Sequence, residues 1–373
     1  MTHLETPEQT ELLGLNMAEL EQYMVSLGEP AYRGRQLHKW IYTRDVSSFY
    51  EMSDIPKELR HRLDRLAVIS IPRVLKQRVS QDRTRKYLLE LADKKRVETV
   101  LIPQSEEKST RYTLCISTQV GCPIGCSFCA TGHSGFQRNL RHYEIVGQVL
   151  GSRRELYKKV KPADNEPLLT NLVYMGMGEP LLNYDEVLQS IYIINDHKGI
   201  NIGQRHITVS TAGEARGIER LAREKLQVTL AISLHACNDA LRDQLVPMNR
   251  KYPLERLLRA VEFYSRENGR RVTFEYVLLD GVNMSRQDAN NMIDILKPLL
   301  ANVNLIPYNE VVGLPYKHPG RAKAEQFCRW LQDGGLNATI REEHGADIEA
   351  ACGQLRAEVK SQALRHDHVS GHR

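Results

Sequence analysis

The sequence predicts an α/β protein whose core is an incomplete (β/α)6 barrel. From about residue 112 onward, short runs rich in β-branched and aromatic residues alternate with amphipathic stretches of helical period. Repeated β–α units imply parallel strands with right-handed crossovers, and six to seven units are too few to close an eight-stranded barrel. The expected strands are 112–118, 171–177, 206–211, 227–235, 271–279, 303–309 and 337–341, and the expected helices are 142–160, 184–197, 213–224, 253–268, 285–300 and 321–334.

The chain before the barrel has a different pattern, which predicts a small accessory domain. Residues 16–66 carry apolar side chains at helical spacing. Residues 67–103 change to strand-like runs, which we interpret as a small sheet that links these helices to the barrel. We therefore divide the chain into a helical and β N-terminal domain at 1–105, a partial-barrel domain at 106–355 and a polar, histidine-rich tail at 356–373.

Composition limits the classes of protein that fit. The 373 residues contain no apolar run of the roughly 18 residues that a membrane helix needs, and the first residues lack the apolar core of a signal peptide. We therefore expect a cytoplasmic protein with no membrane segment. Seven cysteines in so long a chain indicate metal binding or catalysis rather than a disulfide scaffold. A net charge of +5 is compatible with an RNA partner, although many enzymes without one have a similar excess.

Three closely spaced cysteines carry the strongest chemical signal. Cys122, Cys126 and Cys129 lie in the run QVGCPIGCSFCATG with the spacing C-x3-C-x2-C. Three thiolates can hold three irons of a [4Fe–4S] cluster and leave the fourth iron open to a small molecule. The alternatives are a disulfide pair or a structural zinc site, which would need Cys115 or His133 as its fourth ligand. With a phenylalanine before the last cysteine, the pattern resembles the signature of radical S-adenosylmethionine (SAM) enzymes.

Other unusual motifs fall at the expected C-terminal ends of strands, where barrels place their functional residues. In MGMGEPLLN (175–183), Gly178 permits close backbone approach and Glu179 can accept hydrogen bonds from an ammonium group. Alone this is a glycine-rich turn, but one β–α unit after the cysteines it resembles the GGEP motif with which radical SAM enzymes bind the SAM amino group. Polar residues at later strand ends suit the same cofactor, although each alone is more often a strand-end cap. They are Ser210, Ser233, His235 and Asn309, and Leu234 lies between Ser233 and His235.

Two further cysteines stand apart from this group. Cys115 lies inside the first expected strand, and Cys352 lies between an alanine and a glycine in GADIEAACGQLRAE. A lone cysteine is usually a small buried hydrophobe, and we keep that interpretation for Cys237 and Cys328. Small neighbours and a turn-like segment give Cys352 the access that a reactive thiol needs.

Together the motifs resemble the RlmN/Cfr family of radical SAM methyltransferases, which act on adenine in RNA. The resemblance runs from about residue 18 to 360, and MGMGEPLLN resembles the RlmN branch. It is carried by RVETV (96–100), TLCISTQVGC (113–122), GFQRNL (135–140), MGMGEPLLN, SLHA (233–236), VPMN (246–249), LIPYN and DIEAACGQL.

The resemblance assigns roles to individual residues. It implies that Cys122, Cys126 and Cys129 bind the cluster, that Cys352 is itself methylated, that Cys115 is its thiol partner in a transient disulfide and that Glu98 accepts a proton. It implies that SAM contacts Gly178, Glu179, Ser210, Ser233, Leu234, His235 and Asn309. Arg138, Arg141, Lys158, Lys159 and Lys161 are basic residues that we expect to contact RNA phosphates, although such runs are often only solvated surface.

The implied reaction methylates carbon 2 of adenine, which is electron-poor and has no nucleophilic lone pair. The family uses two SAM molecules per turnover, one to methylate Cys352 and one to generate the radical that activates this methyl group. The implied partners are 23S rRNA, tRNA and an electron donor such as flavodoxin or ferredoxin, and we expect a monomer. The alternatives are a Cfr-type enzyme that methylates carbon 8, and a non-catalytic RNA-binding protein with a structural metal.

Overall fold

A single ten-stranded sheet organises the molecule. The computed structural model describes residues 9–104, 111–160 and 167–356, so residues 357–373 of the expected tail lie outside it. Seven strands of this sheet are parallel, as expected, and lie in the order β14-β13-β12-β11-β10-β9-β6. They are β6 (Arg111–Cys115), β9 (Leu169–Tyr174), β10 (Ile207–Thr211), β11 (Thr229–Ser233), β12 (Val272–Leu278), β13 (Ala301–Pro307) and β14 (Ala338–Ile340). The expected partial barrel is confirmed, because β14 forms an edge of the sheet and does not pair with β6.

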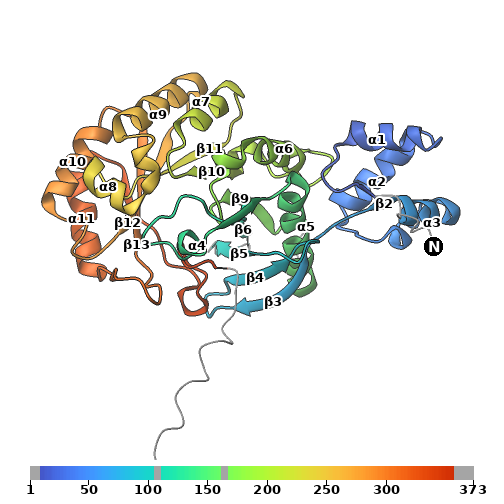
Figure 1. Ribbon diagram of the computed structural model, residues 1–373, viewed down its shortest axis with the longest axis horizontal. Helices are drawn as coiled ribbons and strands as arrows, with labels where there is room; N and C mark the ends of the chain where they lie inside the picture. The colour runs from blue at the N-terminus through green and yellow to red at the C-terminus, as the bar shows by residue number, and fades with distance from the viewer. Residues whose placement is uncertain (1–8, 105–110, 161–166, 357–373) are drawn as a thin grey trace, which may run out of the picture.

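Helices cover the outer face of the parallel strands (Figure 1). They are α5 (His142–Lys159), α6 (Tyr184–Asn195), α7 (Ala215–Arg223), α9 (Leu254–Asn268), α10 (Arg286–Leu296) and α11 (Arg321–Asp333). Local signals fix their ends: Ser285 and Asp288 form a capping box at the start of α10, and Gly269 ends α9 in the left-handed conformation. Short helices occupy the connections, namely η2 (Pro180–Asn183), η3 (Gln204–His206), α8 (Asp239–Leu245) and η4 (Pro247–Arg250).

The N-terminal helices pack together beside the barrel (Figure 1). They are α1 (Met17–Ser26), α2 (Tyr32–Tyr42), η1 (Phe49–Glu51) and α3 (Lys57–Leu66), and β1 (Thr10–Glu11) pairs with β2 (Ala67–Val68). Tyr42 is fully buried, and its hydroxyl accepts from Gly14 N at 2.9 Å and donates to Leu15 O at 2.7 Å. Arg153 on α5 forms an ion pair with Asp45, which attaches the helices to the barrel.

Three antiparallel strands extend the main sheet instead of forming a separate linking sheet. They are β3 (Arg73–Val79), β4 (Arg85–Glu90) and β5 (Arg96–Gln104). The pairing of β5 with β6 makes the sheet continuous from the accessory region into the barrel, with Val100 opposite Cys115. The inner face of β5 therefore continues the inner face of the barrel.

Two connecting segments frame the mouth of the barrel. The strands β7 (Gln119–Gly121) and β8 (Phe136–Asn139) form a small ribbon that closes the cysteine loop, which contains α4 (Ala130–His133). After β14 the chain passes through η5 (Ala346–Ile348) and returns to the antiparallel strands, where Lys86 Nζ donates to Glu349 O at 2.9 Å. Among the described residues, no helix is long and apolar enough to span a membrane.

Candidate active site

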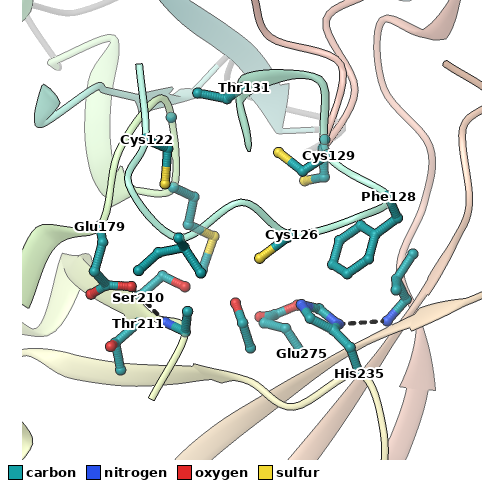
Figure 2. A pocket seen from close by; sticks show the side chains of 18 of the residues that line it. Cys122, Cys126, Phe128, Cys129, Thr131, Glu179, Ser210, Thr211, His235 and Glu275 are labelled. Carbon is teal, nitrogen blue, oxygen red and sulfur yellow. Dashed lines mark hydrogen bonds between the residues drawn. The ribbon is translucent and has the colours of Figure 1, made fainter. Parts of the chain in front are cut away.

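The three clustered cysteines direct their sulfur atoms into one pocket at the mouth of the barrel (Figure 2). Cys122 directly follows β7, inside the loop that the β7–β8 ribbon closes, and Cys129 is the N-cap residue of α4. The loop between them is held in place, because Ser127 N donates to Leu245 O at 3.1 Å and Cys129 N donates to Cys126 O at 3.1 Å. The pocket has a volume of about 950 Å³ including its open mouth, which is within the range of cofactor sites.

The arrangement of these thiols fits an iron–sulfur cluster better than zinc. Within the described parts of the chain, no three His, Cys, Asp or Glu side chains are arranged to hold one metal ion. Around one zinc the sulfurs would lie about 4 Å apart, because Zn–S bonds of ~2.3 Å meet tetrahedrally. In a cubane cluster each thiolate binds a different iron, so the three sulfurs need not meet at one metal ion. Burial, with the charges of Cys129 and Cys122, raises the pKa of the Cys126 thiol well above its usual range. Bound iron would offset the free-energy cost of a buried thiolate at this position.

The motif after β9 places a buried carboxylate beside the cysteines (Figure 2). Gly178 has a φ of +108°, and an added Cβ would lie 2.7 Å from Thr118 Oγ1, so only glycine fits there. Glu179 is 2% exposed and caps η2, and its oxygens accept from Ala212 N at 2.7 Å and Leu181 N at 3.0 Å. Burial raises the pKa of Glu179 to about 7. An ammonium group in the pocket would stabilise the ionised form of this carboxylate.

The remaining expected SAM contacts lie in three different places. Ser210, Ser233 and His235 line the same pocket as the cysteines, whereas Leu234 is fully buried and does not line it. Asn309 lines an adjoining cavity that also contains Cys352. Sequence order alone could not separate these groups, because neighbouring residues at a strand end point in opposite directions.

His235 is held in one orientation at the floor of the pocket (Figure 2). Its φ is +60°, its ring is 4.8 Å from the ring of Phe128, and its Nδ1 accepts from Val277 N at 3.0 Å. Burial, with the charge of Arg242, lowers the pKa of His235 to about 3. The imidazole is therefore neutral and carries its proton on Nε2.

The structure brings together the two cysteines that are far apart in the sequence. Cys352 is exposed and lines both the main pocket and a smaller cavity. Cys115 is buried on β6 and lines this smaller cavity. The Cys352 loop is attached to the cysteine loop, because Ala130 N donates to Gly353 O at 2.8 Å. All seven cysteines are free thiols, and Cys237 and Cys328 are buried outside these cavities, as expected.

Glu98 lies on the inner face of β5 but not in the main pocket. By strand alternation it shares a face with Val100, which lines the Cys115–Cys352 cavity. Its carboxylate lies 3.3 Å from Lys86 Nζ and accepts from Arg356 N at 2.8 Å. The C-terminal segment therefore covers Glu98 in this conformation.

Two charged residues at the site were not singled out from the sequence. Arg341 directly follows β14 and lines both the main pocket and the Cys115–Cys352 cavity, and the charge of Cys352 raises its pKa. Glu275 is buried on β12, where Oε1 accepts from Asn304 Nδ2 at 3.1 Å and Oε2 has no hydrogen-bond partner among the described residues. Glu275 could have been found from the sequence, because it is the one charged residue in the largely apolar run VTFEYVL.

The basic residues expected to contact RNA are mostly engaged within the protein. Arg138, Arg141 and Lys158 each form an ion pair with an acidic side chain of the same chain. Lys159 is exposed at the end of α5, and Lys161 lies outside the described residues.

Comparison with known proteins agrees with this geometry. Residues 116–293 match the model of the radical SAM superfamily, and residues 10–69 match the ribosomal RNA large subunit methyltransferase N-terminal domain. A protein of Syntrophomonas wolfei named "Probable dual-specificity RNA methyltransferase RlmN" is 64% identical over 95% of this chain and 99% of its own length. The chain belongs to the RlmN family. The RlmN of Halorhodospira halophila is 46% identical over 94% of both chains.

A solved structure agrees with membership of the RlmN family. The crystal structure of a radical SAM methyltransferase from Sphaerobacter thermophilus matches with a TM-score of 0.88 and 43% identity, covering 94% of this chain and all of that one. The fold and enzyme class expected from the sequence are thus confirmed. As a radical SAM enzyme of the RlmN family, the protein uses a [4Fe–4S] cluster and SAM, with two SAM molecules per turnover.

Proposed function

We infer that this protein methylates carbon 2 of a specific adenine in 23S rRNA and of an adenine in some tRNAs. One observation carries the inference: the exposed Cys352 opens into the pocket of the three clustered cysteines and Glu179, while Cys115 lies in the adjoining cavity. The RlmN relatives, named as dual-specificity RNA methyltransferases, support RNA as the substrate.

Each pocket residue has a proposed role in holding the cofactors. Cys122, Cys126 and Cys129 would hold the cluster through three irons. Glu179 would accept hydrogen bonds from the SAM ammonium group. The other SAM contacts would be Gly178, Ser210, Ser233 and His235 in the same pocket, and Asn309 from the adjoining cavity. When bound, the cluster and SAM supply the methyl group and the hydrogen-abstracting radical that adenine carbon 2 requires.

The two separate cysteines handle the methyl group and its release. Cys352 lies on an exposed loop, so its thiol can both accept a methyl group and meet a base that enters from solvent. Once carbon joins Cys352 to adenine, a second thiol must break the carbon–sulfur bond. Cys115, in the shared cavity, would attack the sulfur of Cys352 and form a disulfide, while the carbon stays on the base and takes up a proton to become the methyl group. Glu98 would accept the proton lost from the ring.

The RNA must present its adenine in an unstacked form. The pocket is recessed at the barrel mouth, so a base inside a helix cannot reach it without leaving the stack. The N-terminal domain at 1–105 would contact the RNA backbone and contribute Glu98, and the other catalytic residues lie in 106–355. We further propose a cytoplasmic monomer that receives electrons from flavodoxin or ferredoxin.

Nucleoside analysis of RNA from a strain that lacks this protein tests the proposal. Digested 23S rRNA and tRNA should lose 2-methyladenosine, and the wild-type chain but not Cys126→Ala should restore it. Methylation at carbon 8 would instead indicate a Cfr-type enzyme. Unchanged methyladenosine in both RNAs would contradict the proposal and favour a non-catalytic RNA-binding protein.

A further inference from the structure

Arg242 on α8 is a fully buried arginine that the proposed reaction does not use. Its Nε donates to Leu234 O at 3.0 Å, its Nη1 to Asn249 Oδ1 at 2.9 Å, and its Nη2 to Ala212 O at 2.8 Å and Ser233 O at 3.1 Å. These acceptors are backbone carbonyls and one amide, and none is a carboxylate. The hydrogen bonds satisfy the guanidinium, but they do not neutralise its charge.

Two nearby carboxylates connect to Arg242 through Asn249. The Nδ2 of Asn249 donates to Asp239 Oδ1 at 2.9 Å and to Asp243 Oδ1 at 2.7 Å. The Oδ1 of the same side chain accepts from Arg242. A buried charge without an ionic partner is costly, so such a residue is expected to have a counter-charge. Burial lowers the pKa of Arg242 to about 10, and Cys126 is the strongest opposing influence.

The position of Arg242 shows where this counter-charge can lie. Ala212 and Ser233, whose carbonyl groups it binds, line the pocket that contains Cys126. The helix that carries Arg242 ends at Leu245, whose carbonyl accepts from Ser127 N, one residue after Cys126. The guanidinium therefore lies directly behind the wall of the cysteine pocket.

We propose that Arg242 is the buried counter-charge of the iron–sulfur cluster and makes the cluster easier to reduce. A [4Fe–4S] cluster held by three thiolates is a net anion, and its negative charge increases when it accepts an electron. A fixed cation behind the pocket wall stabilises the reduced form more than the oxidised form, which raises the reduction potential. The inference rests on the assignment of Cys122, Cys126 and Cys129 as the cluster ligands.

A redox titration of the reconstituted protein, followed by electron paramagnetic resonance without SAM, tests this role. Arg242→Gln should lower the reduction potential of the cluster, whereas Arg242→Lys should stay close to wild type because it keeps the charge. The control Arg259→Gln removes an exposed arginine of α9 and should leave the potential unchanged. A wild-type potential in Arg242→Gln would overturn the proposal. Loss of the cluster from the Gln variant but not from the Lys variant would support it.

A second variant keeps the test decisive if both Arg242 variants fail to fold. Asp243→Asn removes a negative charge behind Asn249 while leaving an acceptor for its amide, so the local field becomes more positive. The reduction potential of the cluster should rise in this variant. An unchanged potential would contradict the proposal that the charges around Arg242 act on the cluster. Iron and sulfide analysis of Cys126→Ala tests the ligand assignment separately from the role of Arg242. If the three cysteines are not the cluster ligands, this variant would retain its full cluster.

Discussion

The role proposed for Glu179 predicts a large and specific loss of SAM affinity in Glu179→Gln. Both carboxylate oxygens already accept backbone N–H groups, from Ala212 and Leu181. A glutamine must turn its NH2 group towards one of these donors or towards the SAM ammonium group. Hydrogen bonds to charged groups contribute about 1.5–3 kcal/mol. The Kd for SAM should therefore rise roughly 10- to 150-fold.

Equilibrium binding of SAM to the cluster-loaded protein measures this effect. Glu214→Gln is a matched control, because Glu214 is also buried and also accepts a backbone N–H, from Gly217, but does not line the pocket. Each variant should lose about 1–3 kcal/mol of unfolding free energy if a buried donor is left unsatisfied. Only Glu179→Gln should weaken SAM binding. Equal Kd values for SAM in the two variants would refute the assigned contact.

Four further predictions follow from the same structure. Cys126→Ala should lose the cluster and reductive SAM cleavage, and cleavage at the wild-type rate would contradict the ligand assignment. Cys352 in protein purified from cells should carry one extra CH2 unit by peptide mass spectrometry, and an unmodified thiol in active protein would count against the mechanism. Cys115→Ala should purify with covalently attached, nuclease-sensitive RNA, whereas the matched buried cysteine variant Cys328→Ala should not. Tyr42→Phe should lower the unfolding free energy by about 1–3 kcal/mol, because Gly14 N loses its buried acceptor, with normal SAM cleavage.

Much of the barrel could be predicted from local pattern. All seven parallel strands lie where apolar β-type runs were expected, although the first expected strand, 112–118, is observed as Arg111–Cys115. A nearly continuous apolar run identifies such a strand, because a parallel strand inside an α/β fold buries its side chains on both faces. Periodicity did not show that β3, β4 and β5 belong to the same sheet, because strand pairing is made by backbone groups that the sequence does not mark.

The candidate site was predictable where chemistry depends on spacing within one segment. Cys122, Cys126 and Cys129 line one pocket with Glu179, as their motifs indicated. Leu234 is the exception among neighbouring motif residues, because its side chain is buried away from the pocket. The position of a motif in the sequence predicts which loop lies at the site. It does not predict which side chains of that loop point into the pocket.

The sequence by itself determined the parallel β–α order, the cysteine triad and the glycine turn before Glu179, because each depends on residues close together in the chain. Tertiary structure decided that Cys115 and Cys352 share a cavity and that Arg242 is buried behind the cysteine pocket. The helix of Arg242, DALRDQL, has the composition of a surface helix. Arg242 itself is buried, and it donates to the carbonyl groups of Ala212 and Ser233, which follow or end other strands of the barrel.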